Sequence, residues 1–409
     1  MNAGSPQKTQ RTQRVMCLLC VLCVLGGERA RAQEPNAPQS VSPVQLKAAI
    51  GKLGDLDYAT RTSASRLVRR TPAAQAVPAL MEAVSDSADG YVRYRALVLM
   101  TGFNDPRAKD SVREALTSPN DRLRTVAYSF FEQNPDPAML PQFVKALEAE
   151  QGEFVRPALV RAVAATAANG NSLAVVQARQ LLVRDVTRGE DFFRSSVIAA
   201  LGDYKAAYAY DAVTSVAKLD GPLQDDAALT LGKIGDKRAL ETLAQLQRTA
   251  PRQAQPSIAA AICLLNINCS SHENYLTEAL KFSQKNLGYQ ELLRAAASGL
   301  GALGVAGHAE AATTLFEIGI PAKDDALRAP VALALATIAL RNTPVMLTLL
   351  EHDEHRDASL SLLAEGFDML EEDLDKERFF ALARRTYWES PAGSPRRALM
   401  QTIIAKLDF

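Results

Sequence analysis

Residue types on which much enzyme chemistry depends are scarce in this sequence of 409 residues. It contains four histidines and one tryptophan, and three of its five cysteines fall between residues 17 and 23. The motifs G-x-S-x-G, H-E-x-x-H and C-x-x-C-H, typical of a nucleophile elbow, a metalloprotease centre and a haem attachment, are all missing. The sequence therefore predicts no catalytic residue and no cofactor, and we expect a protein that is not an enzyme.

The sequence also has no excess of positive or negative charge. The 46 lysines and arginines are matched by 46 aspartates and glutamates. Nucleic-acid binding usually requires a clearly basic surface, and attachment to a membrane surface usually requires a basic tract. We therefore expect neither a nucleic-acid partner nor an electrostatic membrane anchor.

The chain has one notable apolar run, which lies close to the N-terminus. Lys8, Arg11 and Arg14 precede eleven apolar residues, Val15 to Leu25, and the small residues of "ARA" follow at 30–32. This order is typical of a secretory signal peptide. A run of eleven residues is also too short for a bilayer, which requires about 20 residues in a helix.

We therefore predict a signal peptide over residues 1–32, with cleavage after Ala32 and a secreted or periplasmic product. No stable membrane insertion is expected after cleavage. In this interpretation Cys17, Cys20 and Cys23 are apolar side chains of the leader and not metal ligands.

Cleavage changes the charge balance and exposes a polar segment. Without residues 1–32 the chain has 41 basic and 45 acidic residues, because the leader contains five basic residues and one acidic residue. The next stretch, "QEPNAPQSVSP", has three prolines and few apolar residues. We predict a flexible linker over residues 33–46.

Only Cys263 and Cys269 remain after the predicted cleavage, in a compartment that permits disulfides. If both were on one helix, six residues of rise would separate them by about 9 Å, which is beyond disulfide reach. Asn266 and Asn268 between them favour turns, however, and can fold Cys269 back. A structural disulfide and two free buried thiols both remain open.

The main chain beyond the linker is repetitive. Six arginines open successive apolar helical patterns, with intervals of 31 to 38 residues between the first five: Arg61, Arg93, Arg124, Arg156, Arg194 and Arg328. Within one unit, Val92, Ala96, Leu99 and Phe103 step by four, three and four, as on one face of an α-helix. No segment alternates in the manner of a β-strand. Two short helices per unit cannot bury both faces unless neighbouring units stack.

We therefore predict an all-α fold over residues 47–409, a right-handed α-solenoid of about ten to eleven helical hairpins. The segments "VRYRALVLMTGF", "DDAALTLGKIGDKRALETL" and "LRAPVALALATIA" resemble HEAT repeats, in particular the short type of the phycobilin lyases. The resemblance implies a superhelical scaffold. It implies little about function, because such repeats serve many roles.

The same resemblance implies a structural role for the six arginines. In HEAT-like families the equivalent arginine commonly pairs with an aspartate of the preceding turn, and these pairs stack into a ladder. Candidate partners in this sequence are Asp86, Asp89, Asp121, Asp191 and Asp325. We expect the arginines to be partly buried and paired rather than to form a ligand-binding row.

Three short motifs are typical of ligand sites, but their context favours structural roles. "GLGALG" at 299–304 matches a dinucleotide fingerprint and lacks the preceding strand that this fingerprint needs. "EHDEHRD" at 351–357 contains metal-ligand residues, but it falls where one repeat gives way to the next, which favours a solvated loop. "CSSH" at 269–272 is a lone C-x-x-H with only Cys263 nearby as a third ligand, which is a weak signal. The sequence therefore predicts no metal site.

The function that remains is binding. We expect a non-catalytic extracytoplasmic scaffold or adaptor that binds a protein or peptide on the curved solenoid surface. Tyr204, Tyr208 and Tyr210 form the candidate contact patch, because tyrosine is enriched at protein interfaces. The alternative is a phycobilin-lyase-like enzyme or its partner subunit, which is implied by repeat style alone.

The first prediction concerns the N-terminus. The purified native protein should begin at Gln33, because the apolar run has the length of a leader and is followed by small residues. N-terminal sequencing or intact mass measurement checks this. A native protein that retains Cys17 to Cys23 would show that the segment is not removed.

Overall fold

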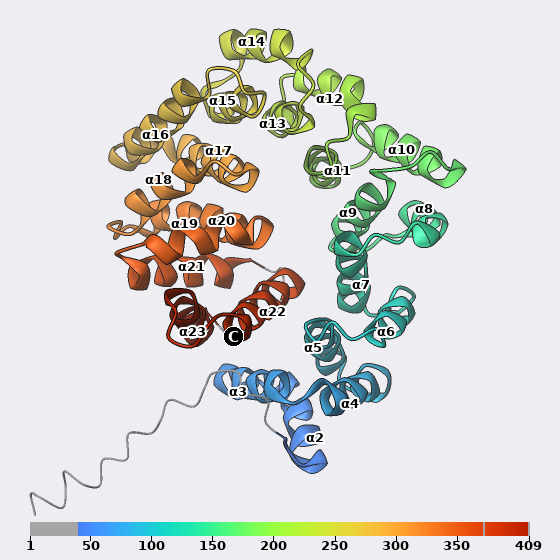
Figure 1. Cartoon of the computed structure of the whole chain (residues 1–409). Coiled ribbons are helices and arrows are strands. Elements are labelled where there is room, and N and C mark those ends of the chain that lie inside the picture. The colour runs from blue at the N-terminus through green and yellow to red at the C-terminus, as the bar shows by residue number, and fades with distance from the viewer. Residues whose placement is uncertain (1–39, 371–372, 408–409) are drawn as a thin grey trace, which may run out of the picture. The chain divides into compact units, whose positions relative to one another are not determined.

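The computed structural model describes residues 40–370 and 373–407, which belong to one compact unit. These residues form α-helices and short 3-10 turns and contain no strand (Figure 1). The predicted signal peptide, residues 1–32, and most of the predicted linker lie outside the described residues. For residues 47–370 and 373–407 the predicted all-α solenoid is confirmed.

The helices form an inner and an outer layer that alternate along the chain (Figure 1). The inner helices are α5 (Gly90–Thr101), α7 (Asp121–Gln133), α9 (Val155–Ala167), α11 (Asp191–Asp203), α13 (Gln224–Ile234), α15 (Gln255–Leu264), α17 (Gln290–Ala306), α19 (Asp325–Arg341) and α21 (Arg356–Met369). The outer helices are α4 (Ala73–Asp86), α6 (Ala108–Ala115), α8 (Leu140–Ala149), α10 (Leu173–Asp185), α12 (Tyr210–Ala217), α14 (Ala239–Thr249), α16 (Cys269–Lys285), α18 (Ala309–Gly319) and α20 (Thr343–His352).

Two helices at each end complete the array. These are α2 (Pro43–Gly51), α3 (Tyr58–Arg70), α22 (Asp373–Glu389) and α23 (Pro395–Leu407). Five 3-10 turns connect helices: η1 (Lys52–Gly54), η2 (Pro137–Met139), η3 (Ala207–Ala209), η4 (Arg252–Ala254) and η5 (Leu287–Tyr289).

The folded array begins earlier than predicted. Ser42 caps α2 by accepting a hydrogen bond from the backbone of Gln45, whose side chain bonds back to the backbone of Ser42. This reciprocal capping box, together with Pro43 in the first turn, starts the helix inside the segment predicted as linker. The linker boundary at residue 46 is therefore corrected to residue 42.

Small residues set the spacing of the inner helices. A Cβ atom at Gly301 of α17 would lie 3.2 Å from the Cβ of Ala334 on α19. A Cβ atom at Gly232 of α13 would likewise lie too close to the backbone of Ala261 on α15. The three glycines of "GLGALG", Gly299, Gly301 and Gly304, are all buried within α17. They allow adjacent helices to approach closely, and the segment forms no strand-to-helix turn of the kind that binds phosphate.

Helix α15 separates two apolar cores. Ile258 and Ile262 pack with the core formed by the preceding repeats, whereas Ala260 and Cys263 pack with the core of the following repeats. Because α15 is alanine-rich and buried on both sides, the solenoid continues through it without an exposed linker.

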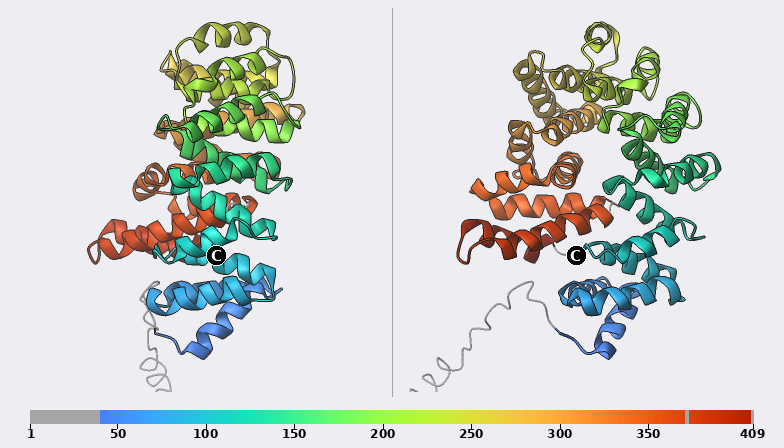
Figure 2. Two further views of the ribbon diagram at one scale, coloured as in Figure 1. Left: turned by 90° about the vertical axis from the view of Figure 1, so that its right-hand side faces the viewer. Right: turned by 45° about the vertical axis from the view of Figure 1, so that its right-hand side comes forward.

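Helix α22 connects the two ends of the array. Its Leu374 belongs to the core of the N-terminal repeats, and its Phe379 and Phe380 belong to the core of the C-terminal repeats. Contacts of α22 with α5, α7 and α19 place the last helices beside the first ones, as Figures 1 and 2 show. The solenoid is therefore closed on itself, which the sequence did not predict.

Candidate functional site

Five of the six arginines of the repeat series, all except Arg156, donate to backbone carbonyls near the ends of neighbouring elements. All six are half-buried. Arg93 donates to the carbonyl of Val84 at 2.7 Å, and Arg328 donates to three carbonyls at the end of α18, that of Gly319 at 3.0 Å among them. Arg61, Arg124 and Arg194 likewise donate to carbonyls that precede their own helices. A guanidinium that caps helix-end carbonyls satisfies groups that have no partner within the helix.

The regular aspartate ladder implied by the resemblance does not form among the described residues. Asp121 and Asp191 pair with Arg124 and Arg194, both three residues away. Asp89 instead caps the N-terminus of α5. In the same series Arg156 stacks on the ring of Phe193, with its guanidinium carbon 3.6 Å from the ring centre.

The three tyrosines of the predicted contact patch lie in the packing of the repeats. Tyr210 is 8% exposed, so it is too buried to serve as a contact residue. Tyr204 and Tyr208 are half-buried and lie against the guanidinium groups of Arg161 and Arg179. Whether these two contact a partner stays a prediction.

The contact between the two ends of the array centres on Glu377 of α22. Its carboxylate accepts hydrogen bonds from Arg69 of α3 at 2.7 and 2.9 Å and from Arg384 of α22 at 2.7 Å. The Glu377 side chain is 1% exposed and that of Arg69 is 5% exposed. Gly102, at the end of α5, leaves the space that the carboxylate occupies, since a Cβ there would lie 2.5 Å from it.

Two further carboxylates of α22 bind the inner face of the first repeats. Asp373 accepts hydrogen bonds from the hydroxyl of Tyr94 and, at 2.7 Å, from Arg95, both on α5. Asp375 accepts one from Gln133 of α7 at 2.5 Å. These residues, with Glu377, Arg69 and Arg384, are called the closure seam below.

A polar row continues from the seam along the inner helices. Glu132 of α7 accepts hydrogen bonds from Arg161 of α9 and from Tyr204, each at 2.8 Å. Arg161 also binds Asp203 of α11, which binds Lys233 of α13, again at 2.8 Å in both pairs. Four successive inner helices are thus linked by charge-assisted hydrogen bonds.

The electrostatics of the seam favour the ionised forms of Glu377 and Asp373. Burial disfavours the charged form of Glu377, but the charges and hydrogen bonds of Arg69 and Arg384 outweigh this, so its pKa is lowered. Burial also disfavours the charged form of Asp373, but the positive charges of Arg95 and Lys376 outweigh this effect and lower its pKa. A general acid or base that works near neutral pH needs a pKa close to that pH. The seam therefore suits binding and positioning rather than proton transfer.

A small pocket of about 210 Å³ adjoins the seam. Its lining is mostly polar and consists of Tyr58, Arg61, Thr62, Ser65, Arg69, Tyr91, Arg95, Asp368, Asp373, Lys376, Glu377 and Phe380. The cations in this lining that the seam uses are already paired with carboxylates. The pocket therefore shares Arg69, Arg95, Asp373 and Glu377 with the seam.

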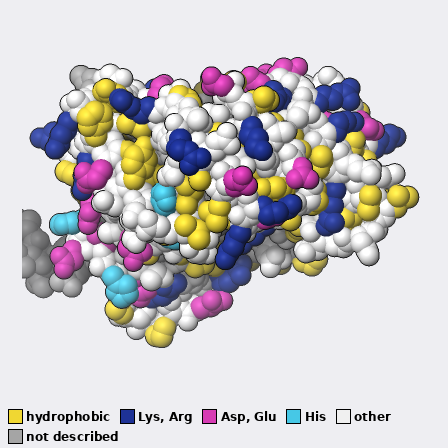
Figure 3. Space-filling model, turned by 90° about the horizontal axis from the view of Figure 1, so that it is seen from above, with side chains coloured by type: hydrophobic (Ala, Val, Ile, Leu, Met, Phe, Trp, Pro, Cys, Tyr) yellow, Lys and Arg dark blue, Asp and Glu magenta, His cyan; other side chains and the backbone are white. Residues whose placement is uncertain are grey.

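The central inner helices expose apolar side chains at their N-terminal ends. Phe154, just before α9, is 74% exposed, and Phe192 in the first turn of α11 is 54% exposed. On the face seen from above in Figure 3, charges of both signs lie side by side. Exposed aromatic residues on a surface of mixed charge are typical of protein interfaces.

The structure brings Cys263 and Cys269 together as a disulfide, with Cα atoms 4.2 Å apart. Their neighbours include Glu273 and His308, two residues that the sequence did not single out. His308 lies 39 residues beyond Cys269, about one repeat along the chain, so no local motif connects them. In contrast, the histidines of "EHDEHRD", His352 and His355, are exposed.

Comparison with known families agrees with this architecture. A profile of HEAT repeats matches residues 46–130 and 77–164, and a profile of the PBS lyase HEAT-like repeat matches residues 223–249. The chain contains HEAT repeats. At least one of its repeats is of the short type that the phycobilin lyases share.

Solved structures of similar shape are remote from this chain. Escherichia coli YibA is 14% identical, with a TM-score of 0.40, and the match covers 65% of this chain and 99% of YibA. Kap95p, solved with RanGDP, is 14% identical, with a TM-score of 0.41, and the match covers 90% of this chain and 56% of Kap95p. Matches this remote carry no information on function. No curated protein matches the sequence.

The described helices were also compared with the length of a membrane span. No single one of them is long and apolar enough to cross a bilayer. Helices α19 and α20 meet the length and composition expected of a membrane span only when they are taken together, and they are bent by 114° at their junction.

The second prediction concerns the closure seam of the HEAT-repeat array. Replacing Glu377 with Gln removes the buried carboxylate charge that Arg69 and Arg384 both bind, and breaking a buried ion pair typically costs about 3–5 kcal/mol. Because each repeat contacts mainly its neighbours, the loss should stay local. Amide hydrogen exchange should speed up in α22 and α3 and remain unchanged in α11 and α13.

The matched control is Glu389→Gln. It makes the same change of charge on the same helix at an exposed position. Equal exchange rates in the two variants would show that the seam does not hold the ends together.

Proposed function

We propose that this protein is a non-catalytic extracytoplasmic scaffold that binds a protein or peptide on the inner face of its solenoid. One observation carries the proposal, which is the position of α22 on that face. A helix from one end of the chain lies on the inner helices of the other end, where its carboxylates bind Arg69, Arg95 and Gln133. The inner face thus has the side chains needed to hold a helical segment.

The chemistry of α22 indicates what kind of segment fits. Its acidic contact residues follow one another at intervals of two along the helix. Its aromatic contact residue is Phe380, whose ring centre lies 5.9 Å from the guanidinium carbon of Arg69. Beyond the seam, Phe154 at the start of α9 and Phe192 in the first turn of α11 are exposed apolar side chains of the inner helices. A partner with apolar and charged groups in a short helix or peptide matches both features.

The contact patch in this proposal differs from the one that the sequence favoured. Phe154 and Phe192 are exposed at the N-terminal ends of the inner helices α9 and α11, whereas Tyr210 is buried in the core. Exposed aromatic side chains are common anchors of binding energy, because they bury a large area with few rotatable bonds.

The alternative function, a phycobilin-lyase-like enzyme or its partner subunit, rests on the repeat match at residues 223–249. No observation on the described residues favours it over binding. The paired carboxylates of the closure seam have lowered pKa values, which makes them poor proton donors near neutral pH.

The third prediction places the partner on the inner face. A photo-reactive amino acid is introduced at position 154 or 192 in the full chain, and the protein is irradiated in its native cells. An adduct of one defined mass should form from both positions. The control is position 173 on the outer helix α10, since Leu173 and Phe154 are each 74% exposed.

A second pair of variants tests whether the rings contribute binding energy. Changing Phe154 and Phe192 together to Ala should weaken formation of the adduct from a third inner position, Leu333, while Leu173→Ala should not. Substitutions at exposed sites usually change stability by less than about 0.5 kcal/mol, so the fold should persist in both. Adducts that form only from position 173 would place the partner on the outer face and contradict the proposal.

A further inference from the structure

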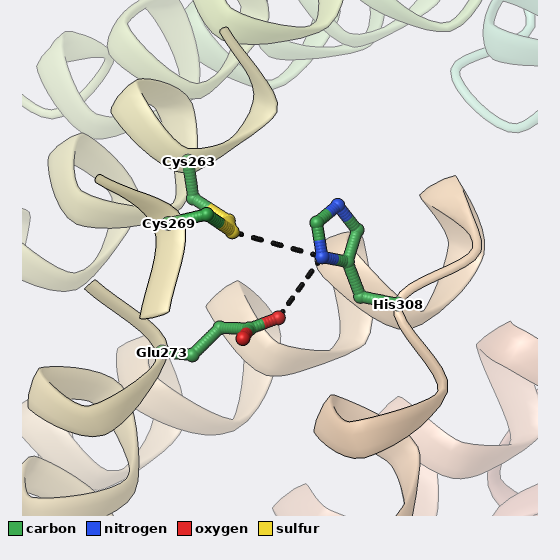
Figure 4. Close-up of side chains that lie close together, drawn as sticks. All are labelled: Cys263, Cys269, Glu273 and His308. Atoms are coloured by element: carbon green, nitrogen blue, oxygen red, sulfur yellow. Dashed lines mark hydrogen bonds and ion pairs between the residues drawn. A yellow bond between two sulfur atoms is a disulfide. The ribbon is translucent and has the colours of Figure 1, made fainter. Parts of the chain in front are cut away.

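Four side chains with metal-binding atoms converge where two consecutive repeats meet (Figure 4). Cys263 lies in the last turn of α15, Cys269 begins α16, Glu273 lies one turn further along α16, and His308 directly precedes α18. One ligand atom of each lies within 4.8 Å of the others. Cys263 is fully buried and the other three are half-buried.

The local backbone explains how residues six apart come together. Asn266 and Asn268 adopt left-handed conformations, with φ of 59° and 45°. Asparagine tolerates this region better than most residues other than glycine, so the two positions allow a tight reversal between α15 and α16. The reversal brings the Cα atoms of Cys263 and Cys269 to 4.2 Å.

The contacts of His308 distinguish a catalytic relay from a metal site. Its Nδ1 lies 2.9 Å from Glu273 Oε1 and 3.6 Å from the sulfur of Cys269. A catalytic Cys-His-acid relay uses the two ring nitrogens for different partners, one for the thiol and one for the acid. Here both partners face the same nitrogen. This arrangement does not suit a relay, but it is what a set of ligands around one ion requires.

The distances also suit a tetrahedral ion. Zinc binds sulfur at about 2.3 Å and imidazole nitrogen at about 2.0 Å, so its tetrahedral S···N separation is about 3.5 Å. The observed separation of Cys269 Sγ from His308 Nδ1 is 3.6 Å. Two thiolates, an imidazole and a carboxylate are ligand types that zinc accepts, and four protein ligands make a closed structural site.

We propose that Cys263, Cys269, Glu273 and His308 bind one zinc ion when the Cys263–Cys269 disulfide is reduced. In the oxidised protein the two sulfurs are bonded to each other, and zinc does not bind. An external dithiol transfers two electrons and two protons to the disulfide, giving two thiols, and is itself oxidised to a disulfide. Zinc then binds the two sulfurs as thiolates and releases their two protons to solvent.

The site has a structural consequence for the array. Its ligands come from α15, α16 and the residue before α18, so the ion joins two repeats that the disulfide alone does not connect. Oxidation replaces this link with a bond confined to the α15–α16 hairpin. The proposal does not rest on the scaffold function and stands or falls separately.

Cobalt(II) is the probe that tests the site, because its spectrum reports thiolate ligands and tetrahedral geometry. The purified full chain is reduced with a dithiol, freed of the dithiol and of metal without air, and titrated with Co²⁺. We expect thiolate-to-cobalt charge-transfer bands that saturate at one equivalent and disappear when one equivalent of Zn²⁺ is added. The unreduced protein should show no such bands.

Two histidine variants form a matched pair. His308→Ala should weaken Co²⁺ binding by at least about tenfold, since even the loss of an outer partner of a ligand commonly costs that much. His272→Ala removes a histidine that is not among the four ligands and lies on α16, the helix of Cys269 and Glu273. The affinity of this variant should equal that of the unmodified chain. Circular dichroism checks that both variants retain their helices.

Three results would overturn the proposal. They are a reduced, unmodified chain with no charge-transfer band, equal affinity of the His308→Ala and unmodified chains, and equal bands before and after reduction. The first of these needs no variant, so the test does not depend on whether a substitution folds.

Discussion

A buried carboxylate that needs counter-charges from both ends of the chain is the constraint on which this architecture depends. Glu377 cannot remain ionised in the interior unless Arg69 and Arg384 bind it, because a charge without a partner there is strongly disfavoured. Arg69 lies 308 residues away along the chain. The pair is therefore satisfied only when the solenoid curves far enough for α22 to reach α3.

This constraint also determines which part of the inner face is free. The first repeats already hold α22, through Tyr94, Arg95 and Gln133, whereas the central repeats expose Phe154 and Phe192. A partner that binds the inner face thus meets a surface whose ends are fixed relative to each other. Closure reduces the range of curvature that an open array of repeats would have, which lowers the entropic cost of binding at the central repeats.

The local features were predictable from the sequence, and the long-range ones were not. Helical periodicity and regularly spaced arginines predict the repeats, and Asn266 and Asn268 indicate the turn that brings the cysteines together. Nothing in the local pattern identifies Glu377 as buried, because its partner on α3 is separated from it by nine repeats. Tyrosine is enriched at protein interfaces, which predicts a contact role for Tyr210, but this residue begins α12 directly after the η3 turn and is buried in the core. Periodicity shows which face of a helix is buried, but it cannot show which distant helix covers it.

The measurement that tests closure most directly is a distance across the seam in solution. Spin labels on non-natural amino acids at Ser63 of α3 and Arg385 of α22, both exposed, leave the native cysteines untouched. Pulsed electron paramagnetic resonance should give one narrow distance distribution, set by the contact between these two helices. A broad distribution at long distances would show that the ends of the solenoid are apart and would contradict the closed array.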